Sequence, residues 1–282
     1  MSTWIKEGGS WKEATEEKVK INGKWVETTQ TYIKVNGKWE DPNAMPISFQ
    51  MEVTSADEPT VYSVVGGNAV VVANGAGEWI INFYGTVTEF LMNENKTTIT
   101  TNRKVTKIKV TKNLTVNSLH SSFVQLSSMT SFEWGTGVKS DTITNLRDMF
   151  ENSGGTFTWN DFDFSNVTTT SYMFYGWKGT SLDVSGMDFT ALTDMSHMFE
   201  QVLDVVSIKM PPNSKMPKVS CNLKYLFINC PRIVCISNLD TIHGVPNDSL
   251  FHGSNALTSP DKATQTKLES PAGFAYDKGS PC

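Results

Sequence analysis

Residues 163–176 read DFSNVTTTSYMFYG, and the Phe that nearly closes this stretch recurs along the second half of the chain. Successive members of the series are 27, 24, 25, 28 and 24 residues apart: Phe123, Phe150, Phe174, Phe199, Phe227 and Phe251. A short apolar segment of β type follows most of them. Repeats of about 20–29 residues with one strand each are typical of a solenoid.

Each repeat unit is predicted to contain a short helical or turn piece that carries the Phe, then a loop, then a short strand. The expected strands are SFEW (131–134), FTW (157–159), LDV (182–184), VSI (206–208) and IVCI (233–236). One unit cannot bury its own apolar face, so neighbouring units must stack. We therefore expect the Phe side chains to form one buried column, which makes them core residues rather than a ligand site.

These repeats resemble those of the BspA-type leucine-rich-repeat surface proteins. The residues that carry the resemblance are LRDMFENSGG (146–155), DFSNVTTTSYMFYG (163–176), LDVSGMDFTALTDMSHMFEQ (182–201) and LFINCPRIVCI (226–236). Departures are the pairs ending at Phe123, Phe227 and Phe251, which lack the Met, and a longer unit containing 210–218. The resemblance covers roughly residues 105–276, and the tail SPDKATQTKLESPAGFAY (259–276) is similar to the ends of phage-encoded members. It implies a solenoid for surface display and adhesion, with no catalytic residues to carry over.

A second repeat, with a period of 14, occupies residues 4–41. Its copies read WIKEGGSWKEA, VKINGKWVE and IKVNGKWED, and they place Trp11, Trp25 and Trp39 in register. The Asn-Gly pairs at 22–23 and 36–37 favour type I′ turns, so each copy is predicted to be one hairpin. Three short hairpins offer too little chain to enclose three Trp side chains. We expect these Trp residues to dock on the next domain or on another chain, the alternative being a free-standing β-meander.

The tandem VKVNGKW hairpin resembles a short module frequent in bacteriophage tail and appendage proteins. The match covers residues 4–41, and three copies in register make it moderately specific. In such proteins the module accompanies virion attachment or assembly. The resemblance thus implies that residues 1–45 dock on other virion proteins or on sister copies.

Residues 48–92 alternate in short apolar runs separated by Gly-rich turns, which predicts a small antiparallel sandwich or sheet layer. The expected fold class is mainly β, in four parts. They are a hairpin module (1–45), a small β-sandwich-like domain (46–104), a solenoid (105–258) and a tail (259–282).

Charge and hydropathy exclude several classes of protein. The chain has 24 Lys+Arg against 29 Asp+Glu, a net charge of -5, and three Arg, so a duplex-binding protein is not expected. No apolar run approaches about 18 residues, which argues against a membrane-spanning helix. The first residues, MSTWIKEGGSWKEATEEK, are polar and acidic rather than the basic-then-apolar pattern of a secretion signal.

The titratable residues predict no catalytic site, no metal and no cofactor. The four His residues are scattered without a ligand spacing: His120, His197, His243 and His252. Cys221, Cys230 and Cys235 do not match a zinc knuckle. We expect buried thiols, with a Cys230–Cys235 disulfide as the alternative, and Cys282 either free or crosslinked between chains.

The densest aromatic set is Trp134, Trp159, Tyr172, Tyr175 and Trp177. Some of these must be core residues. If two or three lie exposed in a row, they can stack sugar rings or anchor a protein partner. The candidate receptor or partner surface is Trp159, Tyr172, Tyr175 and Trp177.

The function expected from these features is that of a structural bacteriophage virion protein, assembled in the host cytoplasm. It would be a tail fibre or other appendage that docks by its hairpins and displays the solenoid to a host glycan or protein. The alternatives are a bacterial surface adhesin of the same repeat family and a capsid decoration or head-fibre protein. A polysaccharide depolymerase would need paired carboxylates, and no local pair stands out. Appendages act by multivalency, so an oligomer is expected, with a trimer as a guess.

Overall fold

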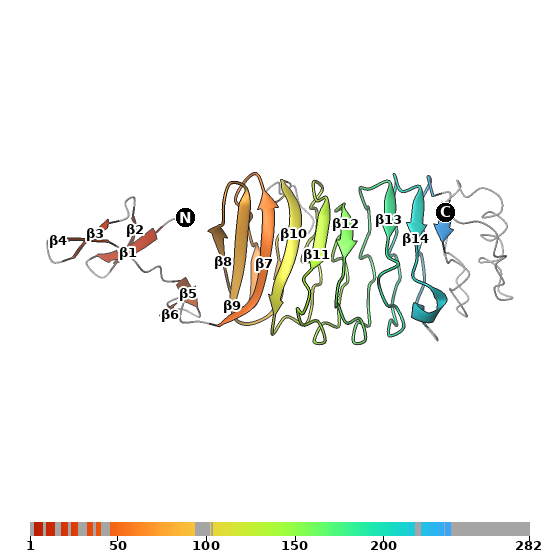
Figure 1. Ribbon diagram of the computed structural model, residues 1–282, viewed down its shortest axis with the longest axis horizontal. Helices are drawn as coiled ribbons and strands as arrows, with labels where there is room; N and C mark the ends of the chain where they lie inside the picture. Colours follow the sequence, from red (N-terminus) through yellow and green to blue (C-terminus); the bar gives the residue numbers. More distant parts are fainter. Residues whose placement is uncertain are drawn as a thin grey trace.

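A computed structural model describes residues 46–93, 102, 104–217, 221–233 and 235–237, together with the backbone of six strands within residues 3–40. Within these residues nearly all regular structure is β, and the helical part is one short 3-10 turn, η1 (Asn213–Lys215). The fold is a β-solenoid-like stack of about five turns that continues into an antiparallel sheet (Figure 1). The mainly β class predicted from the sequence is confirmed.

The larger sheet has six strands in the order β12-β11-β10-β7-β9-β8. Strands β7 to β10 pair antiparallel, whereas β10, β11 and β12 pair in parallel. Their bounds are β7 (Ile47–Ser55), β8 (Ser63–Ala73), β9 (Glu78–Leu91), β10 (Val105–Asn113), β11 (Ser131–Trp134) and β12 (Thr156–Thr158). Buried and exposed residues alternate along much of β7 and β10, so one face of the sheet lies on the core.

A glycine pair permits a bulge where β8 meets β9. The pairing register shifts between Val65 and Gly67. Gly66 has a φ of 84°, and a Cβ at this position would lie 2.1 Å from the carbonyl oxygen of Thr86. Only glycine fits such a close approach of two backbones at a positive φ.

The antiparallel strands are not the separate sandwich-like domain expected at 46–104. Strand β10 pairs with β7 on one side and with β11 on the other, so the antiparallel strands and the first solenoid turns share one sheet. Their cores are also joined, since the rings of Phe90 and Phe123 lie 5.6 Å apart. The first turn of a solenoid exposes an apolar end, and residues 47–91 cover it.

The solenoid turns repeat one strand each. After β11 and β12 a second, three-stranded parallel sheet follows in the order β13 (Ser181–Asp183), β14 (Ser207–Lys209) and β15 (Cys235–Ser237). Strands β11 to β15 overlap the five segments expected after the repeat Phe residues, and the bounds of all but β11 are shifted by one or two residues. Equivalent residues of successive turns also form parallel bridges at a second position: Ser118, Asn145, Thr169, Asp194 and Asn222.

The piece that carries each Phe is a series of tight turns rather than a helix. In every described unit the residues two before and two after the Phe have left-handed backbone, as at Asp148 and Asn152 around Phe150. The N–H of Phe150 donates to the carbonyl of Met173 in the next turn at 3.0 Å, and the N–H of Phe174 donates to Met198 at 3.0 Å. This ladder between turns satisfies backbone groups that a helix would have bonded within itself.

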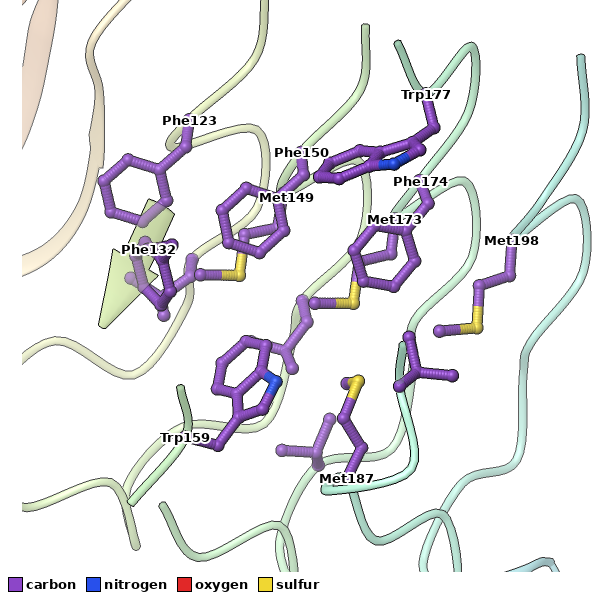
Figure 2. Close-up of a cluster of buried hydrophobic side chains, with 14 of the residues drawn as sticks. Phe123, Phe132, Met149, Phe150, Trp159, Met173, Phe174, Trp177, Met187 and Met198 are labelled. Carbon is purple, nitrogen blue, oxygen red and sulfur yellow. The ribbon is translucent and has the colours of Figure 1, made fainter. Parts of the chain in front are cut away.

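The repeat Phe residues form one buried column along the stack (Figure 2). Phe123, Phe150, Phe174, Phe199 and Phe227 have no exposed surface. Neighbouring rings are stacked, with centroids 5.8, 5.9, 5.8 and 5.3 Å apart along the series. Phe251 lies outside the described residues. The column is therefore structural, as the repeat spacing predicted.

The backbone of residues 3–40 forms three antiparallel strand pairs. In each, the second strand contains the repeat Trp, and the register pairs it with a Lys, as in Lys20 opposite Trp25. The strands are β1 (Thr3–Glu7), β2 (Ser10–Ala14), β3 (Lys18–Ile21), β4 (Lys24–Glu27), β5 (Ile33–Val35) and β6 (Lys38–Glu40). The side chains of the three Trp residues, and the tail 259–282, lie outside what is described.

Candidate functional site

The four aromatic residues expected at a receptor surface do not lie together on one. Trp159 and Trp177 are core residues, with 6% and 1% of their surface exposed, and only Tyr172 and Tyr175 are half-buried at the surface. Trp159 follows β12 and shares the inward face with Phe157, because alternate residues of an extended chain share a face. Of the four candidate residues, Trp159 and Trp177 are thus the ones that belong to the core, and Tyr172 and Tyr175 are the ones that reach the surface.

A column of surface side chains does run along the tight turns that carry the Phe residues. We call this edge of the solenoid the corner, and the column the corner column. Tyr172, His197 and Tyr225 each stand two residues before a repeat Phe, on three successive turns. The rings of Tyr172 and His197 are 4.3 Å apart and nearly parallel, and those of His197 and Tyr225 are 4.9 Å apart. Cations cover both ends of this corner column, since Arg147 lies over Tyr172 at 5.4 Å and Lys224 over Tyr225 at 4.8 Å.

A shallow groove of about 460 Å³ follows the corner column. It is lined by Arg147, Asp148, Glu151, Tyr172, Tyr175, His197 and Glu200. Most of the polar groups in it already have partners. The Arg147 Nε donates to Asp148 at 3.2 Å, and His197 Nδ1 lies 2.5 Å from Glu200. Burial, followed by the nearby Glu200 carboxylate, raises the pKa of both Tyr172 and Tyr175 above its ordinary value.

His120 joins the antiparallel sheet to the first two corners. Its Nδ1 lies 3.3 Å from Glu89 of β9, and its Nε2 lies 3.3 Å from Asp148. The hydrogen bond to Asp148 is the largest cause of a raised pKa at His120. Desolvation opposes that rise, while the charge of Asp148 and then Glu89 adds to it. The protonated imidazole thus suits this position better than the neutral one.

A second hollow, of about 500 Å³, opens between β12 and β13; we call it the slot. It is lined by Gly155, Thr156, Phe157, Thr158, Trp159, Asn160, Ser181, Asp183, Ser185 and Gly186. Phe157 and Trp159 are its aromatic lining residues, and the remaining lining is mainly small or polar. The indole Nε1 of Trp159 is buried and has no hydrogen-bond partner among the described residues. Two of the other polar side chains of the slot have partners: Asp183 accepts from Ser185 and Lys209, and the Asn160 amide donates to the carbonyl of Trp134.

The described cysteines behave as core residues. Cys221 and Cys230 are buried, and the Cys230 thiol donates to the carbonyl of Phe199 at 3.0 Å. Burial raises the pKa of the Cys221 thiol to about 12. The side chain of Cys235, and with it the alternative Cys230–Cys235 disulfide, lies outside the described residues, as do Cys282, His243 and His252.

The described residues place no three His, Cys, Asp or Glu side chains where these could share a metal ion. None of their helices has the length and apolar character needed to cross a membrane.

Sequence reasoning missed both the corner groove and the slot. The signal for the corner column was present in the repeat alignment, because the position two before the Phe carries Asp148, Tyr172, His197 and Tyr225 in turn. The slot had no comparable signal, because its lining residues come from two successive turns. No protein-family model, curated protein or solved structure matches this chain.

Proposed function

We propose that this chain is a structural, non-catalytic virion protein of a bacteriophage, a tail fibre or other appendage. It docks by its amino-terminal hairpins and displays the solenoid for adhesion to a host or partner molecule. The tandem VKVNGKW hairpins and the BspA-like, leucine-rich-repeat character of the solenoid units support this proposal by resemblance. The antiparallel pairs β1–β2, β3–β4 and β5–β6 agree with the prediction of one hairpin in each copy of the repeat.

The observation that carries the proposal is the repetition of one surface position on successive turns. Stacking brings Tyr172, His197 and Tyr225 into a continuous column, with Arg147 and Lys224 at its two ends. Solenoids bind partners through such extended faces, since each turn adds the same surface to a longer one. A rigid face of this kind, joined to a separate docking module, is the arrangement that an adhesive appendage requires.

The first test is whether the protein is part of the particle. Mass spectrometry of purified virions should detect it at a fixed copy number, and antibodies against the solenoid should label one defined part of the particle in electron micrographs. Labelling of the head rather than the tail would favour a head fibre or capsid decoration protein. Absence from particles, with abundant protein in the infected host, would overturn the proposal.

A second test concerns docking. Deleting residues 1–45 should leave a folded solenoid that is not incorporated into particles. A variant with Trp11, Trp25 and Trp39 all changed to Ala should behave in the same way, whereas changing Lys6, Lys20 and Lys34 to Ala should not. Normal incorporation of the truncated protein would exclude docking by the hairpins. Size-exclusion chromatography with light scattering of the full chain tests the expected oligomer.

A further inference from the structure

Strand β8 forms an open edge of the six-stranded sheet. Among the described strands it pairs only with β9, and it is the outermost strand on the side of the amino-terminal hairpins (Figure 1). Its 11 residues, SVVGGNAVVVA, include no charged residue and no proline. Soluble proteins protect long edge strands with charges, Pro residues or bulges, because an open edge pairs with other strands. The bulge at Gly66 interrupts only the first part of β8, so residues 67–73 present a regular, uncharged edge.

Alternate peptide groups of this part of β8 point away from β9. The N–H of Asn74 donates to the carbonyl of Glu78 at 2.8 Å, so the residues at even positions before Asn74 face β9. By the same alternation, the N–H and C=O groups of Gly67, Ala69 and Val71 lie on the outer side of the strand. A further strand placed beside β8 can therefore form ladder hydrogen bonds with them.

A groove of about 610 Å³ follows this edge; we call it the edge groove. Its lining includes four apolar side chains that pack against the core but are only partly buried, and the rest of the lining is mainly polar: the four are Val61, Val64, Ala69 and Val71. The β9 partners of Ala69 and Val71 are Phe83 and Ile81, which have no exposed surface. The core is thus fully covered at β9 and left partly open at β8, where one more strand would complete the cover.

The third hairpin of the chain is tethered within reach of this edge. Residues 41–46 join the end of β6 to β7, where Ile47 pairs with Tyr84 of β9, and Tyr84 pairs with Asn68 of β8. Neighbouring strands lie about 4.8 Å apart, so a strand outside β8 would lie about 14 Å from β7. Six extended residues span about 20 Å, which is enough to cover this distance. The backbone of β5 in fact has Cα atoms within 8 Å of β8.

We infer that the open edge of β8 and the edge groove are the docking surface for the third hairpin, β5–β6, of the same chain. One strand of the hairpin pairs with the outward peptide groups of β8, and Trp39 enters the edge groove. An indole combines a large apolar surface with one N–H donor, which suits a groove with apolar and polar lining. The short tether favours this hairpin over a second copy of the chain, because it keeps the local concentration of the hairpin high.

The inference gives the three hairpins of the proposed docking module different roles. The third hairpin completes the cover of the solenoid core, whereas Trp11 and Trp25 of the first two remain for other virion proteins. It rests on the proposed function only for what the first two hairpins bind. Docking of the third hairpin is measured in the isolated protein, so its failure and the failure of the virion assignment are distinguishable.

The test is amide hydrogen exchange in the full-length protein and in three variants, Trp39→Ala, Trp25→Ala and Trp11→Ala. In the unchanged protein the outward amides of β8 should be protected, as they are in an internal strand. Trp39→Ala should speed their exchange by about tenfold or more, because the docked hairpin opens more often. Trp25→Ala and Trp11→Ala remove the equivalent residue from the other hairpins and should leave the exchange of these amides unchanged.

The amides of Phe150 and Phe174, which bond between solenoid turns, serve as the control for folding and should keep their protection in all three variants. Fast exchange of the outward β8 amides in the unchanged protein would overturn the inference, and so would equal effects of the three Trp substitutions. Measurements at low and at high protein concentration separate the occupants of the edge. Protection that is independent of concentration supports docking within one chain. Protection that grows with concentration would assign the edge to a second copy and overturn the inference.

Discussion

Replacing Phe174 with Ala tests whether the Phe column supplies the stability of the solenoid. Phe174 is fully buried in the middle of the column, with its ring stacked at 5.9 Å on Phe150 and at 5.8 Å on Phe199. It also contacts Phe157 at 5.2 Å and Trp177 at 5.5 Å. The hydrogen bonds between turns hold the backbone on both sides, so the cavity cannot collapse. We expect a loss near the upper end of the usual range of about 3–5 kcal/mol for Phe→Ala in a core.

The measurement is urea unfolding followed by tryptophan fluorescence and by circular dichroism. Leu203→Ala is the matched control, because Leu203 is 52% exposed and its loss should change the free energy of unfolding by no more than about 0.5 kcal/mol. Each turn contacts only its neighbours, so Phe174→Ala should also broaden or split the transition. A loss below about 1 kcal/mol for Phe174→Ala would contradict the stacking argument.

Three further changes test other contacts. The pKa of His120 is raised in the folded protein, so its contribution to stability is fully present below about pH 6.5 and is lost as the pH rises through the folded pKa. His120→Gln should therefore destabilise the protein at about pH 5 but not at about pH 9. Equal losses at both pH values in denaturant titrations would contradict this. Gly66→Ala should lower the melting temperature more than Gly137→Ala, because both have positive φ but only the Gly66 site also meets a carbonyl oxygen; calorimetry of the two variants decides. Cys221, with its pKa raised to about 12 by burial, should react with iodoacetamide only after unfolding, and labelling in the native state as fast as in urea would refute the burial.

The sequence by itself determined the solenoid and its column. The Phe residues recur every 24 to 28 positions, so each unit carries its Phe at the equivalent point of its own turn. This placement depends on the sequence of the unit itself and not on its neighbours. The strand after each Phe could also be predicted, since the alternation of apolar residues along a strand is a local property of the sequence. The turns around Phe150 and its equivalents were left open between helix and turn, because the left-handed residues on either side of the Phe have no unique residue type.

Tertiary structure alone decided which aromatic residues reach the surface and which strands pair. Tyr172 and Trp177 belong to the same corner, yet the first lies at the surface and the second in the core, since turn geometry rather than sequence alternation sets their directions. The shared sheet through β10 and the interruption between β12 and β13 depend on contacts between residues far apart in sequence. In particular, Phe157 and Trp177 come from successive turns and their ring centroids lie 5.2 Å apart, and no local pattern in the sequence records such a contact between two turns.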